Sequence, residues 1–163
     1  MSLARETVLL VEDDRNDTML LQRVFERFNL ARPLQVVGSG ETAVAYLDGQ
    51  GDYGNRQEYP LPTLMFVDLK LPGMSGFEVL TWVRQQPRLS RTQVVVLTGS
   101  RKSLDLYRAY ELGANSYLVK PIKAGDIAGL AQSLKLPWLA LAADVPADRA
   151  NAGEGAAQVA SAG

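Results

Sequence analysis

Acidic, hydroxyl and amine residues follow the apolar runs of this 163-residue sequence. The acidic triplet 12–14 follows one run and Asp68 follows another, while Thr98 and Lys120 follow two later runs. Carboxylate oxygens bind hard divalent cations, and a carboxylate beside such a cation can attack phosphorus. A lysine and a hydroxyl can hold phosphoryl oxygens as negative charge spreads onto them. These residue types predict phosphoryl chemistry, provided that the fold brings them together.

The composition excludes several other kinds of chemistry. The sequence has no Cys and no His, so thiolate nucleophiles, histidine bases and zinc sites built from these residues are excluded. We therefore expect a bound metal to have oxygen ligands, with Mg²⁺ favoured and Mn²⁺ possible. A net charge of −1 does not favour nucleic acid or an acidic membrane as partner. Without a signal-peptide core or a membrane-spanning run, we expect a cytoplasmic protein.

Short apolar runs alternate with amphipathic stretches along the chain. The runs predict strands at Thr7–Val11, Leu34–Val37, Thr63–Val67, Gln93–Leu97 and Ser116–Val119. The amphipathic stretches predict helices at Asp14–Asn29, Thr42–Leu47, Phe77–Val83, Leu104–Leu112 and Ile127–Leu134. Five strands alternating with five helices predict an α/β fold, in which helices cover both faces of a doubly wound parallel sheet.

This fold would place the polar residues at one edge of the sheet. Ligands of doubly wound sheets bind beyond the carboxyl ends of the strands. If the first and third strands are neighbours, the acids that follow them lie close together. Two carboxylates about 4 Å apart repel by about 4 kcal/mol at an effective dielectric of 20, and a divalent cation removes this repulsion. The sequence therefore predicts a Mg²⁺ site at this edge, with the lysine and threonine nearby.

Four motifs, VLLVEDD, VDLKLPGMSG, VVVLTGS and SYLVKP, occur in this order along the chain. In order and spacing they resemble the receiver domains of bacterial response regulators, from about Thr7 to Leu141. The resemblance implies a flavodoxin-like sheet with strand order 2-1-3-4-5, which places the first and third strands side by side. It also implies a two-component response regulator that accepts a phosphoryl group from a partner sensor histidine kinase and switches its protein contacts. Such a phosphoacceptor is not an enzyme, and we expect it to lose the group by slow autodephosphorylation.

The resemblance assigns roles to the acidic residues. Asp68 matches the phosphoacceptor, Asp13 a direct metal ligand and Glu12 a ligand that acts through water. Three successive acids leave this register open by one residue, at Asp14. The backbone carbonyl of Lys70 matches a further metal ligand.

The resemblance also assigns roles after the fourth and fifth strands. Thr98 matches the switch hydroxyl, and Tyr117 matches the switch aromatic residue. Lys120 matches the amine that binds the phosphoryl group, and its bond to Pro121 matches the cis peptide of the family.

Two other functions stay open beside the switch. One is a phosphatase that forms an aspartyl phosphate, although the second acid that such enzymes carry two residues after the nucleophile is replaced here by Lys70. The other is a phosphate sink without an output of its own.

A narrower resemblance comes from the long segment Gly49–Leu61 and the ending SLKLPWLAL. Both are similar to single-domain regulators that partner bacterial phytochromes, so a bacteriophytochrome is a candidate partner. The segment is polar, and we expect it to be exposed and mobile. We expect a receiver domain over residues 1–141 and a disordered, Ala- and Gly-rich tail over residues 142–163, with no second domain.

Apolar residues after Pro137 suggest contact with a second copy of the chain. The predicted core is complete by Leu134, yet Trp138, Leu139 and Leu141 follow. Left in water, they would form an apolar patch that monomers rarely carry. We therefore expect a homodimer built on the fourth helix, the fifth strand and this segment.

Overall fold

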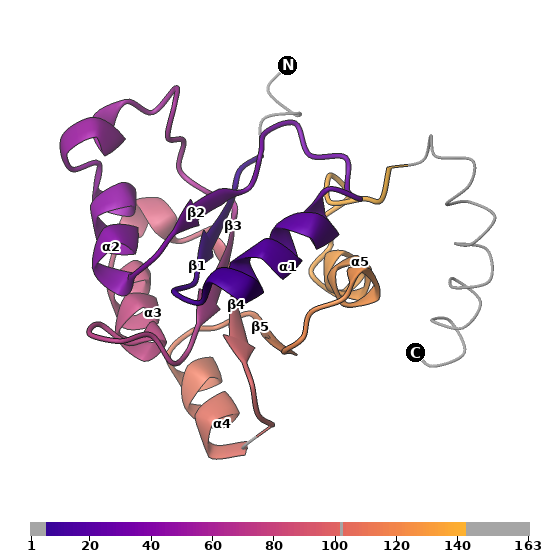
Figure 1. Ribbon diagram of the computed structural model, residues 1–163. Coiled ribbons are helices and arrows are strands. Elements are labelled where there is room, and N and C mark those ends of the chain that lie inside the picture. The colour runs from indigo at the N-terminus through magenta and orange to yellow at the C-terminus, as the bar shows by residue number, and fades with distance from the viewer. Residues whose placement is uncertain (1–5, 102, 143–163) are drawn as a thin grey trace.

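A computed structural model describes residues 6–101 and 103–142 (Figure 1). Its strands are β1 (Val8–Val11), β2 (Gln35–Val37), β3 (Leu64–Asp68), β4 (Gln93–Thr98) and β5 (Ser116–Val119). Its α-helices are α1 (Arg15–Phe25), α2 (Gly40–Asp48), α3 (Gly76–Arg84), α4 (Ser103–Glu111) and α5 (Ala124–Ser133). Two short 3₁₀ helices are η1 (Gly51–Gly54) and η2 (Pro87–Leu89). The predicted disordered tail lies outside the described residues, except for Ala142.

The five strands form one parallel sheet in the order β2-β1-β3-β4-β5, as expected. Side chains alternate between its two faces, because successive residues of a strand point in opposite directions. On one face, Leu9, Met65 and Val94 pack with α2, α3 and α4. On the other face, Leu10 and Phe66 pack with α1 and α5. The sheet is thus covered on both sides, and the carboxyl ends of its strands are left open at one edge (Figure 1).

Helix α1 is shorter than the sequence predicts. It ends at Phe25, and the expected extension to Asn29 is wrong. Phe28 pairs instead with Leu141 in an isolated antiparallel bridge, and the N–H of Asn29 donates to the carbonyl of Ala140 (2.8 Å). Phe28 therefore reaches the core from an extended segment, although its spacing from Phe25 also fits the apolar stripe of a helix.

The segment after α5 completes the core of its own chain, which corrects the expectation of a core finished by Leu134. Leu139 is only 2% exposed and packs with Leu136 against α1 and α5. Trp138 is half-buried against the same cluster. Leu139 is therefore not available as a dimer contact. Leu141 is 41% exposed and stays available.

The insert between α2 and β3 is mostly exposed, as expected, but Tyr53, Arg56 and Tyr59 are half-buried and contact α2. Tyr53 and Tyr59 pack edge to face at 4.9 Å between ring centroids, and both contact the buried ring of Tyr46. Arg56 donates to the carbonyls of Tyr46 (2.8 Å), Leu47 (2.8 Å) and Tyr59 (3.1 Å). Its guanidinium thereby binds the carbonyl of Leu47 in the last turn of α2, where carbonyls lack helical partners, and ties the insert to the end of this helix.

We expect Arg56→Ala to lower the free energy of unfolding by about 2–3 kcal/mol, because it removes three hydrogen bonds from a charged donor to partly buried carbonyls. Arg88→Ala is the matched control. Arg88 also reaches the carbonyl of Leu47 (3.3 Å), but its ion pair with Asp48 is exposed, so we expect a loss below about 1 kcal/mol. Urea unfolding measures both variants. Equal losses would contradict the structural role given to Arg56.

Within residues 6–101 and 103–142, none of the helices is long and apolar enough to cross a membrane.

Candidate functional site

The acids that follow β1 and β3 lie side by side because these two strands are paired. Val11 is opposite Val67 in the ladder, so Glu12 and Asp13 leave β1 beside Asp68, the last residue of β3. One carboxylate oxygen from each of these three acids lies within 4.8 Å of the others. Glu12 and Asp68 are buried, whereas Asp13 is exposed. Oxygen donors of this number and spacing fit a hard divalent cation.

Asp68 is held as a carboxylate by hydrogen bonds. Its Oδ2 atom accepts from Lys120 Nζ (2.7 Å), and its Oδ1 atom accepts from the backbone N–H of Lys70 (2.9 Å). Burial alone would raise the pKa of Asp68, but hydrogen bonds from Lys120, Glu12 and the Lys70 amide lower it below its ordinary value. Asp68 is therefore ionised at neutral pH, which is the form that can act as a nucleophile.

Glu12 differs from Asp68 in its protonation. Burial raises the pKa of Glu12 from 4.5 to about 7, although the neighbouring Lys120 ammonium opposes this shift. Lys120 Nζ lies 2.7 Å from its Oε1 atom, and its Oε2 atom accepts from the backbone N–H of Asp14 (3.1 Å). Two neighbouring carboxyl groups thus share one ammonium, and without a metal ion Glu12 holds a proton more readily than Asp68.

This shift predicts how stability depends on pH in the absence of metal. Because the pKa of Glu12 is higher in the folded protein than in the unfolded chain, ionising Glu12 destabilises the fold as pH rises from about 4.5 to about 7. We expect Glu12→Gln to raise the free energy of unfolding by about 1–2 kcal/mol at pH 8 and to change it little at pH 4.5. Urea unfolding in EDTA at both pH values measures the difference.

The exposed Glu111→Gln is the control for the loss of one negative charge, and we expect it to behave as wild type at both pH values. A Glu12→Gln variant less stable than wild type at pH 8 would show that ionised Glu12 does not destabilise the fold.

Asp14 caps α1 and lies outside the acidic cluster. Its side chain accepts from the backbone N–H of Asp17 (2.9 Å), and its backbone is extended, as at an N-cap. This position agrees with the register in which Glu12 and Asp13, and not Asp14, face Asp68.

A close approach of backbones keeps the segment after Asp68 in place. A Cβ atom at Gly76 would overlap the carbonyl oxygen of Asp68, so glycine is required where α3 begins. Ser75 caps α3, since its side chain accepts from the N–H of Glu78 and its own N–H donates to the Glu78 carboxylate. The role of the Lys70 carbonyl as a metal ligand in this segment stays a prediction.

Thr98 and Tyr117 both contact residues of the adjacent α4 region. Thr98 is buried at the end of β4, and its hydroxyl donates to the carbonyl of Ser100 (2.8 Å) and accepts from the Ser100 N–H (3.1 Å). Tyr117 on β5 packs edge to face against Tyr110 of α4, with 6.3 Å between ring centroids. Their roles as switch residues stay predictions, but both lie where a change at the edge of the sheet can reach α4.

Lys120 contacts one acid that the sequence did not single out. Its Nζ atom lies 2.9 Å from the carboxylate of Asp17, which belongs to the first turn of α1. Burial would lower the pKa of Lys120, but the carboxylates of Asp17, Asp68 and Glu12 raise it above its ordinary value. Lys120 is therefore a permanent cation at this edge. The bond between Lys120 and Pro121 is cis, as the resemblance implies.

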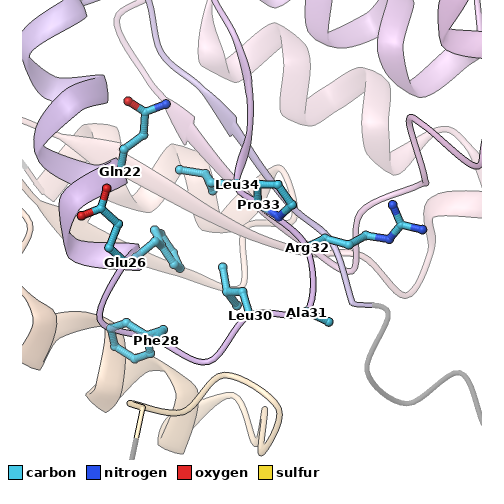
Figure 2. Close-up of a pocket in the computed structure, with 9 residues that line it drawn as sticks. Gln22, Glu26, Phe28, Leu30, Ala31, Arg32, Pro33 and Leu34 are labelled. Atoms are coloured by element: carbon cyan, nitrogen blue, oxygen red, sulfur yellow. The ribbon is translucent and has the colours of Figure 1, made fainter. Parts of the chain in front are cut away.

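A separate cavity lies away from Glu12, Asp13 and Asp68. It measures about 540 Å³ and is formed by the last turns of α1 and by residues 28–34 (Figure 2). Phe28 and Leu34 contribute apolar walls, and Gln22 of α1 and Glu26 just after this helix contribute polar groups. None of the predicted metal-binding or phosphoacceptor residues lines this cavity, so the candidate site is the polar edge of the sheet.

The strand order, the acids beside Asp68 and the lysine after β5 together define a receiver domain. Residues 8–132 match the family described as "Response regulator receiver domain". Because this match spans most of the chain, the protein belongs to the response regulator receiver family, and the function expected from the sequence is confirmed at this level.

Similar proteins include other response regulators. Response regulator Rcp1 of Synechocystis sp. (strain ATCC 27184 / PCC 6803 / Kazusa) is 38% identical over 134 residues, which cover 82% of this chain and 89% of Rcp1. The crystal structure of its Mn(2+)-bound form has a TM-score of 0.66 at 36% identity, covering 85% of this chain and 99% of that chain.

Two further solved structures are similar over most of their length. The phosphorylated cyanobacterial phytochrome response regulator RcpA has a TM-score of 0.66 at 32% identity, covering 82% of this chain and 93% of that chain. The bacteriophytochrome response regulator AtBRR has a TM-score of 0.73 at 38% identity, covering 83% of this chain and 96% of that chain. The sequence-based assignment to the type of regulator that partners phytochromes agrees with these similarities.

Proposed function

We propose that Asp68 accepts a phosphoryl group in the presence of Mg²⁺. The observation that carries this proposal is the position of Asp68, an ionised carboxylate at the end of a central strand, 2.7 Å from a permanent lysine cation. Asp13 and Asp68 would hold the metal directly, Glu12 through water, and Lys70 through its carbonyl. The bound ion supplies positive charge that screens the acids and the transferred phosphoryl oxygens from one another.

The side chains of this protein then perform three tasks. Asp68 supplies the attacking oxygen, and Lys120 holds phosphoryl oxygens through charge-assisted hydrogen bonds. The hydroxyl of Thr98 gives up its bond to the Ser100 carbonyl and turns to the phosphoryl group. Because Ser100 lies in the segment that leads into α4, this exchange changes the surface formed by α4 and β5, where Tyr117 contacts Tyr110.

A sensor histidine kinase of the phytochrome type is the proposed source of the phosphoryl group. The sequence has no His and therefore cannot supply a phosphohistidine itself. The similarity to RcpA and AtBRR, both named as phytochrome response regulators, supports this partner. The proposed cellular location is the cytoplasm, where such a kinase would present its phosphohistidine.

Phosphotransfer profiling tests the partner. Each histidine kinase of the source organism is labelled with radioactive phosphate and mixed briefly with this protein. We expect one phytochrome-type kinase to transfer its label fastest and to leave Asp68→Asn unlabelled. Fast transfer from an unrelated kinase alone would contradict the phytochrome partner and leave the phosphoacceptor function intact.

We also propose that the aspartyl phosphate is lost slowly, as in a switch, and not in repeated enzymatic turnover. Lys70, whose N–H bonds to Asp68, stands where a phosphatase of the aspartyl-phosphate type carries its second acid. Sustained hydrolysis of a small phosphate ester would favour the phosphatase. The phosphate-sink alternative is tested with the same labelled kinases. A sink would accept the label from a kinase, but its phosphorylated form would bind no new protein partner.

The proposed homodimer is built on α4, β5 and the C-terminal segment, in which Leu139 is buried and Trp138 and Leu141 remain partly exposed. Leu104 (81% exposed), Tyr107 (66%) and Tyr110 (46%) present apolar surface on α4. Burying side chains of this size against a second copy stabilises by about 1.5–3 kcal/mol each. We expect Leu104→Ser with Tyr107→Ser to weaken a dimer seen by sedimentation. If only Leu141→Ala weakens it, the contact is the C-terminal segment instead.

A further inference from the structure

The ammonium group of Lys120 is shared by three carboxylates. Its Nζ atom lies 2.7 Å from Glu12, 2.9 Å from Asp17 and 2.7 Å from Asp68. The ammonium donates hydrogen bonds to Asp17 and Asp68 and forms an ion pair with Glu12, so all three carboxylates bind the same positive charge. Glu12 and Asp68 also belong to the cluster that fits a divalent cation, whereas Asp17 does not. A bound metal would therefore offset the negative charge of Glu12 and Asp68 and leave Asp17 paired with Lys120.

The fold holds Asp17 at this place from a separate element. Asp17 lies in the first turn of α1, where its N–H donates to the capping side chain of Asp14. Its own side chain is 35% exposed, and it lies 103 residues before Lys120 in the sequence. The cap sets the start of the helix, and the helix start in turn sets the direction of the Asp17 carboxylate.

The charges at the carboxyl edge of the sheet determine the effect of the contact between Asp17 and Lys120. Four carboxylates gather there, at residues 12, 13, 17 and 68, and Lys120 is the cation that contacts three of them. Phosphorylation converts the single charge of Asp68 into a group that carries a charge of about −2. The phosphoryl group needs the lysine, and Asp17 binds the same ammonium. Any carboxylate beside the phosphoryl group also repels it.

We propose that Asp17 is a positioning residue that competes with the phosphoryl group for Lys120, and so restrains the phosphorylation of Asp68. This inference rests on the proposed function of Asp68. It adds a residue outside the acidic cluster that sets how readily the switch is turned on. When the charge of Asp17 is removed, the phosphoryl group no longer competes with it for the Lys120 ammonium. Phosphorylation of Asp68 therefore becomes faster.

An acyl phosphate of low molecular weight tests the inference without a kinase. With acetyl phosphate, an oxygen of the Asp68 carboxylate attacks phosphorus. The bond from phosphorus to the acetyl oxygen breaks, and acetate leaves with the electron pair. No proton, oxidant or further reactant is needed. Saturating Mg²⁺ keeps metal binding constant among the variants, and mass spectrometry of the intact protein follows the phosphorylated fraction.

We expect Asp17→Asn to be phosphorylated about three times faster than wild type or more, and high salt to narrow the difference. Asp17→Glu keeps the charge and should resemble wild type. Glu26→Gln removes one exposed charge just after the opposite end of α1 and should also resemble wild type. Damage to the helix would slow the reaction, so a faster reaction is not a general structural effect.

A second measurement uses the metal-free protein and needs no reaction. The ¹⁵N resonance of the Lys120 ammonium should shift in Asp17→Asn and stay in place in Glu26→Gln. A rate for Asp17→Asn equal to or below wild type, with Asp68 labelled normally in wild type, would overturn this inference alone. Absence of label on Asp68 in every variant would overturn the proposed function and the inference together.

Discussion

Asp68→Asn is expected to lower phosphorylation by acetyl phosphate by at least about 100-fold, because it removes the attacking oxygen. An amide oxygen is a poor nucleophile and carries no negative charge, whereas the wild-type carboxylate is kept ionised by Lys120 and the Lys70 amide. Mass spectrometry of the intact protein measures the effect at saturating Mg²⁺. Asp52→Asn makes the same chemical change in the exposed insert and should leave phosphorylation unchanged.

The substitution should not unfold the protein, because asparagine has the size of aspartate and can accept from the same backbone N–H. A folded Asp68→Asn protein that is phosphorylated at the wild-type rate would show that another residue accepts the group. Asp13 would then be the first alternative, since its carboxylate lies in the same cluster.

Asp13→Asn should weaken Mg²⁺ binding by at least about tenfold, which corresponds to about 1.4 kcal/mol. Asp13 is the exposed member of the acidic cluster, so its carboxylate is accessible to an incoming ion, and an amide in its place contributes no charge. A Mg²⁺ titration followed by tryptophan fluorescence or calorimetry measures the affinity. Asp68→Asn should weaken binding by a similar factor.

Asp14→Asn is the matched control for this titration. It makes the same change one residue later, and asparagine is as good an N-cap as aspartate, so α1 should keep its start. We expect Mg²⁺ affinity close to wild type. Strong loss in Asp14→Asn with little loss in Asp13→Asn would mean that the metal-binding register is shifted by one residue.

The layout of the sheet and the acidic cluster could be predicted from the sequence because both depend on local patterns. Buried apolar runs define the strands, and the residue that ends each run lies at the edge where ligands bind. Glu12, Asp13 and Asp68 were therefore found from position alone, once β1 and β3 were placed side by side. The order of the strands came from the family resemblance, because alternation of elements does not fix it.

Contacts between distant segments could not be predicted in the same way. Asp17 has the spacing of an ordinary acidic residue in the first turn of a helix, and its contact with Lys120 depends on the tertiary fold that brings the start of α1 to the residue after β5. Leu139 lies beyond the predicted end of the core at Leu134, which suggested a contact with a second copy, yet the chain turns back and buries it. The insert was expected to be exposed because its sequence is polar. The sequence does not show that Arg56 binds carbonyls in the last turn of α2.

The most direct test of the central claim is to locate the phosphoryl group on the wild-type protein. After treatment with acetyl phosphate and Mg²⁺, borohydride reduces an aspartyl phosphate to homoserine, and peptide sequencing by mass spectrometry identifies the converted residue. We predict homoserine at position 68, with Asp13, Asp14 and Asp17 unchanged. Homoserine at any of those three positions with Asp68 intact would contradict the assignment of Asp68 as the phosphoacceptor.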